Sequence, residues 1–173
     1  MQRSSPGTLA SEATAERFRR AVYAGDADAV AALAADDVVV HGPVTTHMAF
    51  RGREEMRELF TVVMANVDDI RYIEDVGDEH LRILTLEGRR GRARYEEAVQ
   101  MRVDDEGRIT ELRIYVRPLP ATVAMAAAFA PALARARHGR VRGRLLWLLL
   151  LPVRAMLMRG DALGVWLLRK PGA

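Results

Sequence analysis

The chain has 173 residues, a formal net charge of +3, 50% hydrophobic residues and no cysteine. This length and composition predict one folded domain with an appendage and exclude a disordered protein. The absence of cysteine excludes disulfides, thiolate nucleophiles and thiolate metal sites. The first residues, MQRSSPGTLASEATAER, are polar and have no apolar secretion signal, so we expect a cytoplasmic protein.

Charge is divided unevenly along the chain. Residues 135–170 hold nine basic side chains and one acid, Asp161, which amounts to +8. Because the whole chain carries +3, the remainder carries −5. The sequence therefore predicts an acidic body with a basic C-terminal segment.

The first third of the chain predicts helices joined by tight turns. After a flexible leader of residues 1–12, apolar residues at helical spacing predict a helix over residues 12–24. Gly25 suits a left-handed C-cap, and Asp26 suits the N-cap of a second helix that ends near residue 35.

A strand and a third helix are expected next. The β-branched run at residues 38–40 predicts a strand that ends before Pro43, because proline cannot donate to a ladder. The third helix begins near Arg53, and its apolar stripe comprises Met56, Leu59, Phe60, Val63 and Val67.

Four antiparallel strands are expected over residues 69–116. Alternating apolar residues and glycine-containing turns place them at residues 69–76, 79–87, 92–103 and 108–116. Helices followed by antiparallel strands predict an α+β domain over residues 13–118. Residues 119–173 are basic and leucine-rich and predict a helical extension on that domain.

Three segments give the chain a resemblance to a known family. They are AGDADAVAALAADDVVV, FRGREEMRELF and DDEGRITELRIYVRPL. In this order and spacing they resemble the SnoaL-like branch of the nuclear transport factor 2-like superfamily, which includes ketosteroid isomerases, scytalone dehydratases and polyketide cyclases. The resemblance implies a cone, in which three N-terminal helices pack on a curved, mostly antiparallel sheet around an apolar pocket. It also implies a homodimer formed through the sheet.

The resemblance places non-catalytic residues where an isomerase has its chemical groups. Phe18 stands in place of the tyrosine that donates to the developing oxyanion, and Gly42 in place of the aspartate base. Val99 stands in place of the protonated aspartate that supplies the second oxyanion donor. Steroid isomerisation by that mechanism is therefore not expected.

Glu97 is the first candidate for chemistry. It lies two residues from Val99, so an extended strand places both side chains on one apolar face. A carboxyl group there would be desolvated, its pKa would rise, and it could act as an acid or base near neutral pH. The alternative is that Glu97 lies at the strand's rim or pairs with a neighbouring arginine.

His41 is the second candidate, because it lies beside Gly42 at the end of the first strand and titrates near neutral pH. Strand alternation points it outward unless a bulge intervenes, so a solvated or loop-bonded histidine is the alternative. His47 lies in a loop expected at the pocket mouth. The sequence shows no metal-ligand spacing and no cofactor motif, so we expect neither a metal nor a cofactor.

Apolar residues at helical and strand spacing are expected to line the cavity or the core, with about half of them touching a ligand. The candidates for ligand binding are Phe18, Phe50, Phe60, Met64, Val99, Met101, Leu112 and Ile114.

The C-terminal extension leaves several interpretations open. Charges at Arg154, Arg159 and Asp161 interrupt its leucines, and each costs roughly 2.5–3.5 kcal/mol at mid-bilayer, so the segment is not expected to span a membrane. It could cover its own pocket or a partner subunit, or it could lie peripherally on a membrane. Nucleic-acid binding is not expected, because aromatic residues are not interleaved with the arginines and a run of leucines follows them.

Three functions fit these observations. The first is a domain that binds a small hydrophobic molecule without catalysis. The second is a cofactor-free lyase, cyclase or isomerase acting on a hydrophobic carbonyl compound, with Glu97, alone or together with His41, moving the proton. The third is a dimeric scaffold with a membrane-peripheral tail.

Overall fold

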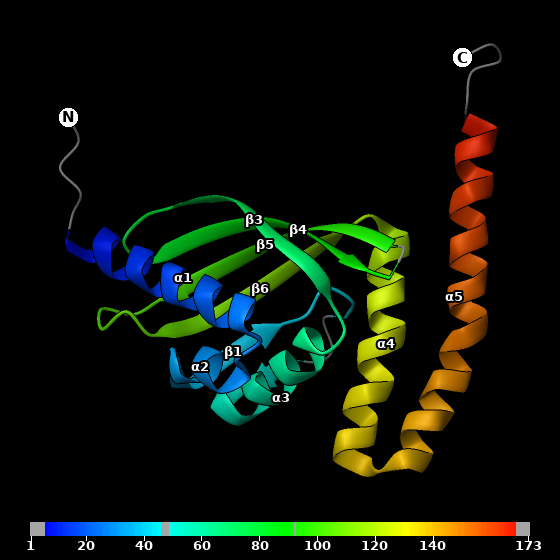
Figure 1. The fold of residues 1–173 in the computed structure, drawn as a ribbon, viewed down its shortest axis with the longest axis horizontal. Coiled ribbons are helices and arrows are strands. Elements are labelled where there is room, and N and C mark those ends of the chain that lie inside the picture. Colours follow the sequence, from blue (N-terminus) through cyan, green and yellow to red (C-terminus); the bar gives the residue numbers. More distant parts are fainter. Residues whose placement is uncertain (1–5, 46–48, 92, 169–173) are drawn as a thin grey trace.

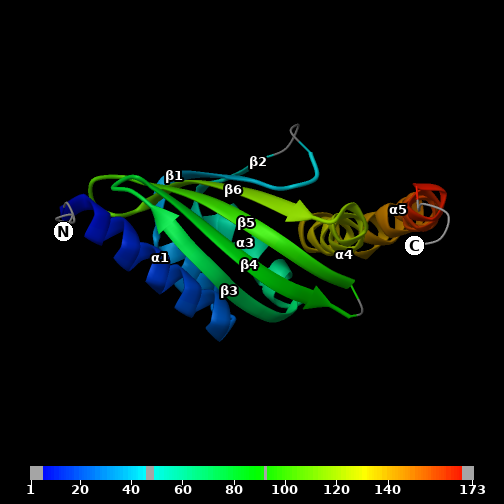
Figure 2. The same cartoon turned by 90° about the horizontal axis from the view of Figure 1, so that it is seen from above.

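A strongly curved sheet forms the centre of the molecule, with helices on its concave side and a helical hairpin at one end (Figures 1 and 2). The structure is a computed structural model that describes residues 6–45, 49–91 and 93–168. Its helices are α1 (Pro6–Ala24), α2 (Ala27–Ala32), α3 (Gly52–Met64), α4 (Leu119–His138) and α5 (Arg140–Leu168). Its strands are β1 (Ala34–His41), β2 (Ala49–Arg51), β3 (Asp68–Gly77), β4 (Leu81–Arg90), β5 (Ala93–Val103) and β6 (Ile109–Arg117).

The six strands run in the order β2-β1-β6-β5-β4-β3. Every neighbouring pair is antiparallel except β1 and β6, which are parallel. The sheet curves without closing, and α1 and α3 lie across its concave face (Figure 2). This confirms the predicted α+β cone with a mostly antiparallel sheet and a helical C-terminal extension.

The turn between the first two helices has the predicted caps. Gly25 adopts φ +67°, which a side chain would disfavour, and its amide donates to the Val22 carbonyl oxygen at 3.1 Å. The Asp26 carboxylate then accepts from the Ala29 amide at 2.8 Å. These two residues reverse the chain within one turn and bring α2 beside α1.

Several element boundaries differ from the prediction for identifiable reasons. The first helix begins at Pro6 rather than at residue 12, since proline is tolerated in a first helical turn. The second helix ends at Ala32 rather than near residue 35, because Leu33 accepts from the Ile109 amide and Ala34 pairs with Ile109 of β6. Strand β2 was not predicted; it forms because Phe50 pairs with Val40.

The core lies between the concave face and the three N-terminal helices. Its largest fully buried side chains are Val30, Val38, Val40, Phe18, Met56, Leu84, Met101, Ile109 and Leu112. Helix α1 is fixed to the narrow end of the sheet by two buried hydroxyl groups. Ser11 donates to the Asp78 carbonyl oxygen at 2.7 Å, and Thr14 donates to the Gly107 carbonyl oxygen at 2.6 Å.

The C-terminal helices form an antiparallel hairpin at the end of the sheet away from the N-terminus (Figure 1). Helix α4 packs on α3, β5 and β6, whereas α5 packs on α4. Of the described helices, α4 is the one whose length and apolar composition would suffice to cross a membrane. It packs on the cone and on α5, with 22% of its apolar window buried.

Candidate functional site

An apolar cavity of about 200 Å³ lies where α4 meets the sheet and α3. The loop after β1 contributes Gly42, Pro43, Val44 and Thr45. Phe50, Leu59, Phe60 and Val63 contribute from β2 and α3, and Glu97 and Ile114 from the sheet. Helix α4 closes the cavity with Met125, Ala126, Phe129, Ala130 and Leu133.

Glu97 is the one ionisable side chain among the described residues that line this cavity. On β5 it stands between Leu86 of β4 and Val116 of β6, within the inward-facing row of the sheet. No hydrogen bond or ion pair joins it to another described residue. Burial in these apolar surroundings raises the pKa of the Glu97 carboxyl group to about 7. The group can therefore hold or release a proton at neutral pH.

Two tyrosines lie near this carboxyl group. Burial, followed by the charge of Glu97, raises the pKa of both Tyr72 and Tyr95 well above the ordinary value. Both phenols therefore stay protonated across the pH range in which Glu97 titrates.

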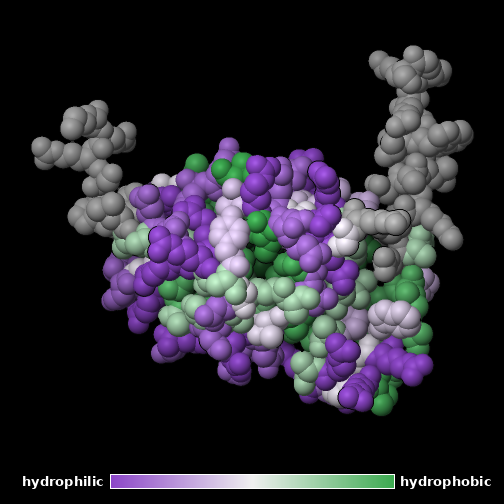
Figure 3. Space-filling model, in the orientation of Figure 1, coloured by the Kyte–Doolittle hydropathy of each residue, from purple (hydrophilic) through white to green (hydrophobic). Residues whose placement is uncertain are grey.

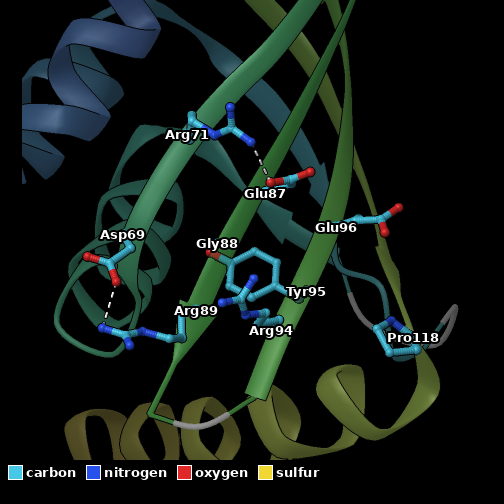
Figure 4. Close-up of a pocket in the computed structure, with 9 residues that line it drawn as sticks. All are labelled: Asp69, Arg71, Glu87, Gly88, Arg89, Arg94, Tyr95, Glu96 and Pro118. Atoms are coloured by element: carbon cyan, nitrogen blue, oxygen red, sulfur yellow. Dashed lines mark hydrogen bonds and ion pairs between the residues drawn. The ribbon is translucent and has the colours of Figure 1, made fainter.

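The alternative for Glu97 was an ion pair with a neighbouring arginine. In the structure the adjacent residue, Glu96, forms such a pair. Glu96 points to the opposite side of the strand, where its carboxylate lies 3.4 Å from the Arg117 guanidinium. Glu96 also borders a groove of about 570 Å³ beside Pro118 (Figure 4). In that groove Arg71 pairs with Glu87 at 2.8 Å and Arg89 pairs with Asp69 at 2.6 Å. The groove is therefore a polar surface in which charges neutralise one another.

His41 lies on the outer face of the sheet and does not line the cavity. Its Nε2 is 3.2 Å from a Glu111 carboxylate oxygen, whereas the preceding Val40 is fully buried. Strand alternation continues to the end of β1, and no bulge turns the imidazole inward. Glu111 also accepts from Arg113, and this hydrogen bond, more than the nearby charges, holds the pKa of Glu111 below its ordinary value. His47 lies outside the described residues.

The eight predicted ligand-binding residues fall into three groups. Phe50, Phe60 and Ile114 line the cavity. Met64 lies elsewhere, in a small surface hollow with Val22 and Ile70. The remaining four, Phe18, Val99, Met101 and Leu112, are buried core residues that do not line it.

Helix α4 supplies five lining residues that were not predicted from the sequence. Met125, Phe129 and Leu133 recur every fourth residue, a spacing that marks one helix face. Arg137, one turn later, holds this face in place: it pairs with Glu58 at 2.8 Å and lies over the Phe50 ring, 5.6 Å from its centroid. Folding back over its own pocket was one of the arrangements considered for the extension.

The three isomerase positions give this site no polar chemistry. The Phe18 ring packs edge-on against Phe60, with centroids 5.6 Å apart, and Val99 is 3% exposed. Gly42 borders the cavity without a side chain. Among the described residues, no group of three or more histidine, aspartate or glutamate side chains is placed to hold a metal ion.

Known proteins share this architecture. The sequence profile of the SnoaL-like domain family matches residues 15–112. No curated protein matches the chain.

Several solved structures superpose on the fold. A steroid delta-isomerase from Pseudomonas aeruginosa superposes with a TM-score of 0.69 and 20% identity, over 79% of this chain and 98% of its own. An uncharacterised bacterial protein with a cystatin-like fold, from Silicibacter pomeroyi, gives 0.67 and 22%, over 72% and 88%. The epoxide hydrolase/cyclase-like enzyme SalBIII gives 0.55 and 22%, over 65% and 93%. At these identities the likeness establishes the fold.

Proposed function

The chain belongs to the family of SnoaL-like domains, and from that premise we propose that its cone binds a small hydrophobic molecule in the cavity beneath α4. The observation that carries the proposal is one carboxyl group, Glu97, placed in an otherwise apolar lining. Binding sites for small molecules are commonly built in this way, with a few polar groups that fix the orientation of an apolar ligand.

The cavity volume limits the size of the ligand. About 200 Å³ is somewhat larger than a cavity of roughly 150 Å³ that accepts benzene, and smaller than the roughly 300–1,000 Å³ of sites for drug-sized molecules. The ligand class that fits is a compound with one ring or a short branched chain.

Glu97 selects a ligand that accepts a hydrogen bond. Below pH 7 its carboxyl group is protonated and can donate to a carbonyl oxygen, which relieves the desolvation of both polar groups. Above pH 7 the carboxylate cannot donate. We therefore propose a hydrophobic carbonyl compound, bound more tightly at pH 6 than at pH 8.

Proton transfer is the second candidate function, and the pKa of Glu97 near 7 is the observation that favours it. The carboxylate would accept a proton from the carbon beside the carbonyl and leave an enolate. A catalyst of this kind also needs a donor for the enolate oxygen. Phe18 and Val99 supply none, and neither Tyr72 nor Tyr95 lines the cavity, so binding without catalysis remains the leading proposal.

Titration with acetophenone by calorimetry tests the binding proposal. Ala130→Phe fills the cavity with a ring and should abolish binding, whereas Ala136→Phe makes the same change at an exposed position of α4 and should preserve it. Thermal unfolding of both variants establishes that they fold. Equal acetophenone affinity in the two folded variants would exclude the cavity as the binding site.

Incubation of the same ligand in D₂O separates a binder from a catalyst. Enzymatic proton abstraction would exchange the acetophenone methyl protons for deuterium, which NMR detects as signal loss. In that case Glu97→Gln should reduce the exchange to the uncatalysed rate. Exchange that persists in Glu97→Gln would remove Glu97 from the mechanism. Absence of exchange in the wild-type chain would leave the protein a binder of this ketone.

The homodimer, the scaffold role and the cytoplasmic location stay predictions that are separate from this proposal.

A further inference from the structure

A second cavity, of about 760 Å³, lies along the α4–α5 hairpin near the end of β4. Its polar lining consists of four arginines and two uncharged donors: Arg90, Arg135, Arg140, Arg144, Asn66 and Trp147. No described carboxylate lines it. Such a concentration of guanidinium groups without an acid favours an anionic ligand.

The arginines of this cavity have no anionic partner among the residues that the structure describes. In contrast, Arg137, on the same hairpin, pairs with Glu55 at 3.3 Å and Glu58 at 2.8 Å. The Arg90 side chain shows the deficit most clearly. Its Nε is buried without a hydrogen-bond partner, and its Nη2 donates to the Asn66 amide oxygen at a distant 3.4 Å. A buried charged donor without a partner is costly, and a bound anion would satisfy it.

Local packing gathers these side chains at one place. At Gly143 the two helices approach so closely that a β-carbon would lie 2.8 Å from Cβ of Arg135 and 2.9 Å from the Pro131 carbonyl oxygen. Arg140 precedes this contact, and Arg144 and Trp147 follow it. The three are spaced by four and three residues, so they share a face of α5. The glycine thus permits the approach that brings arginines of both helices to one cavity.

An exposed apolar stripe adjoins this arginine face. Val141, Leu145 and Leu149, one turn apart on α5, are 73%, 61% and 67% exposed, and Met156 further along is 66% exposed. Figure 3 shows apolar residues along the edge where α5 lies, with hydrophilic residues gathered below them at the turn of the hairpin. A basic cluster beside a leucine stripe matches the two layers of a membrane surface, which are anionic headgroups and acyl chains.

We propose that the cavity between α4 and α5 binds the phosphate headgroup of an anionic membrane lipid while the apolar stripe of α5 lies in the acyl layer. Guanidinium groups recognise phosphate oxygens by paired hydrogen bonds, and Trp147 suits the boundary between headgroups and chains. A soluble phosphate compound would use the arginines but would leave Val141, Leu145 and Leu149 in water. The lipid accounts for both features.

Vesicle binding by the full-length chain tests this proposal. The chain has two tryptophans, so a Trp166→Phe background leaves Trp147 as the reporter. Vesicles that contain equal parts of phosphatidylglycerol and phosphatidylcholine should shift the Trp147 emission to shorter wavelength. The protein should also sediment together with these vesicles. Vesicles of phosphatidylcholine alone should do neither, and millimolar inorganic phosphate should weaken the binding.

Matched arginine variants distinguish a site from general attraction. Arg90→Gln and Arg144→Gln each remove one guanidinium of the cavity and should weaken vesicle binding more than tenfold. Arg142→Gln removes the same charge from the same helix outside the cavity and should weaken it at most about fivefold. Because Arg144 is exposed, its variant keeps the test valid even if Arg90→Gln unfolds.

Three results would overturn the proposal. Equal losses of vesicle affinity in Arg142→Gln and Arg144→Gln would mean that the positive charge of α5 attracts the vesicle without a specific binding site. Equal binding to both kinds of vesicle would exclude headgroup recognition. Binding of inorganic phosphate without binding to either vesicle would assign the cavity to a soluble phosphate compound and reject the lipid.

Discussion

Burial gives the Glu97 carboxyl group a pKa of about 7, against an ordinary value of 4.5. Between these pH values the unfolded chain ionises the group while the folded chain keeps it protonated. The folded state therefore loses stability as the pH rises from about 4.5 to about 7, and the loss ends above that range. The complete shift corresponds to a cost on the order of 3 kcal/mol in the free energy of unfolding.

The substitution Glu97→Gln should remove this pH dependence, because the amide carries no charge at any of these pH values. We expect the variant to match the wild type near pH 4 and to exceed it by about 3 kcal/mol at pH 8, measured by urea unfolding. Glu96→Gln, at the exposed neighbour that pairs with Arg117, should leave the wild-type profile in place. A Glu97→Gln chain that follows the wild-type profile would show that the carboxyl group is solvated.

Helices α4 and α5 contribute differently to the stability of the molecule. Leu133 of α4 is 8% exposed and lines the cavity, whereas Leu149 of α5 is 67% exposed. We expect Leu133→Ala to lower the free energy of unfolding by about 2–4 kcal/mol, because it enlarges the cavity beneath α4. The same truncation at Leu149 should change it by less than about 0.5 kcal/mol.

Denaturant unfolding of the two leucine variants measures this difference directly. A large loss at Leu149 would mean that α5 is covered in solution, by a second copy or by the cone. A negligible loss at Leu133 would mean that α4 does not close the cavity. Either result would also change the interpretation of the raised Glu97 pKa, because the apolar surroundings of this carboxyl group include α4.

Elements with a strong local pattern could be predicted from the sequence. Alternation along β5 placed Glu97 on the inward-facing row of the sheet. Gly25 and Asp26 specified the turn between α1 and α2. The same alternation placed His41 outward, although its position beside Gly42 suggested a catalytic role. For these residues the local rule was the better guide.

Elements that depend on distant contacts could not be predicted. Strand β2 has three residues and no pattern of its own; it exists because Phe50 meets Val40. Residues 33–35 are rich in alanine, which favours a helix, yet Leu33 accepts from Ile109 and the alanines join the sheet. The role of α4 as the cover of the cavity likewise follows from contacts with α3 and β6, which its sequence does not encode locally.

At the scale of the whole molecule, the outer face of the sheet carries apolar side chains that no described element covers. Ile73 of β3 and Tyr115 of β6 are 47% and 54% exposed. They border one shallow groove of about 390 Å³ together with Thr85 and Ala98 of the strands between them. Charged residues also line this groove: Glu74, Glu87, Glu96, Glu97 and Arg117. Exposed apolar side chains with charged neighbours across four strands suit the sheet-to-sheet homodimer that the resemblance implies.

Light scattering after size exclusion should give a mass twice the 19.3 kDa of the chain. Tyr115→Glu places a charge in the middle of the outer face and should reduce the mass to that of a monomer, because a buried carboxylate without a partner opposes association. Val141→Glu introduces the same acid on α5, away from the sheet, and should leave the dimer intact. The opposite result, a dimer lost in Val141→Glu and kept in Tyr115→Glu, would place the interface on α5. It would also assign the apolar stripe of that helix to a second copy of the chain rather than to a lipid surface.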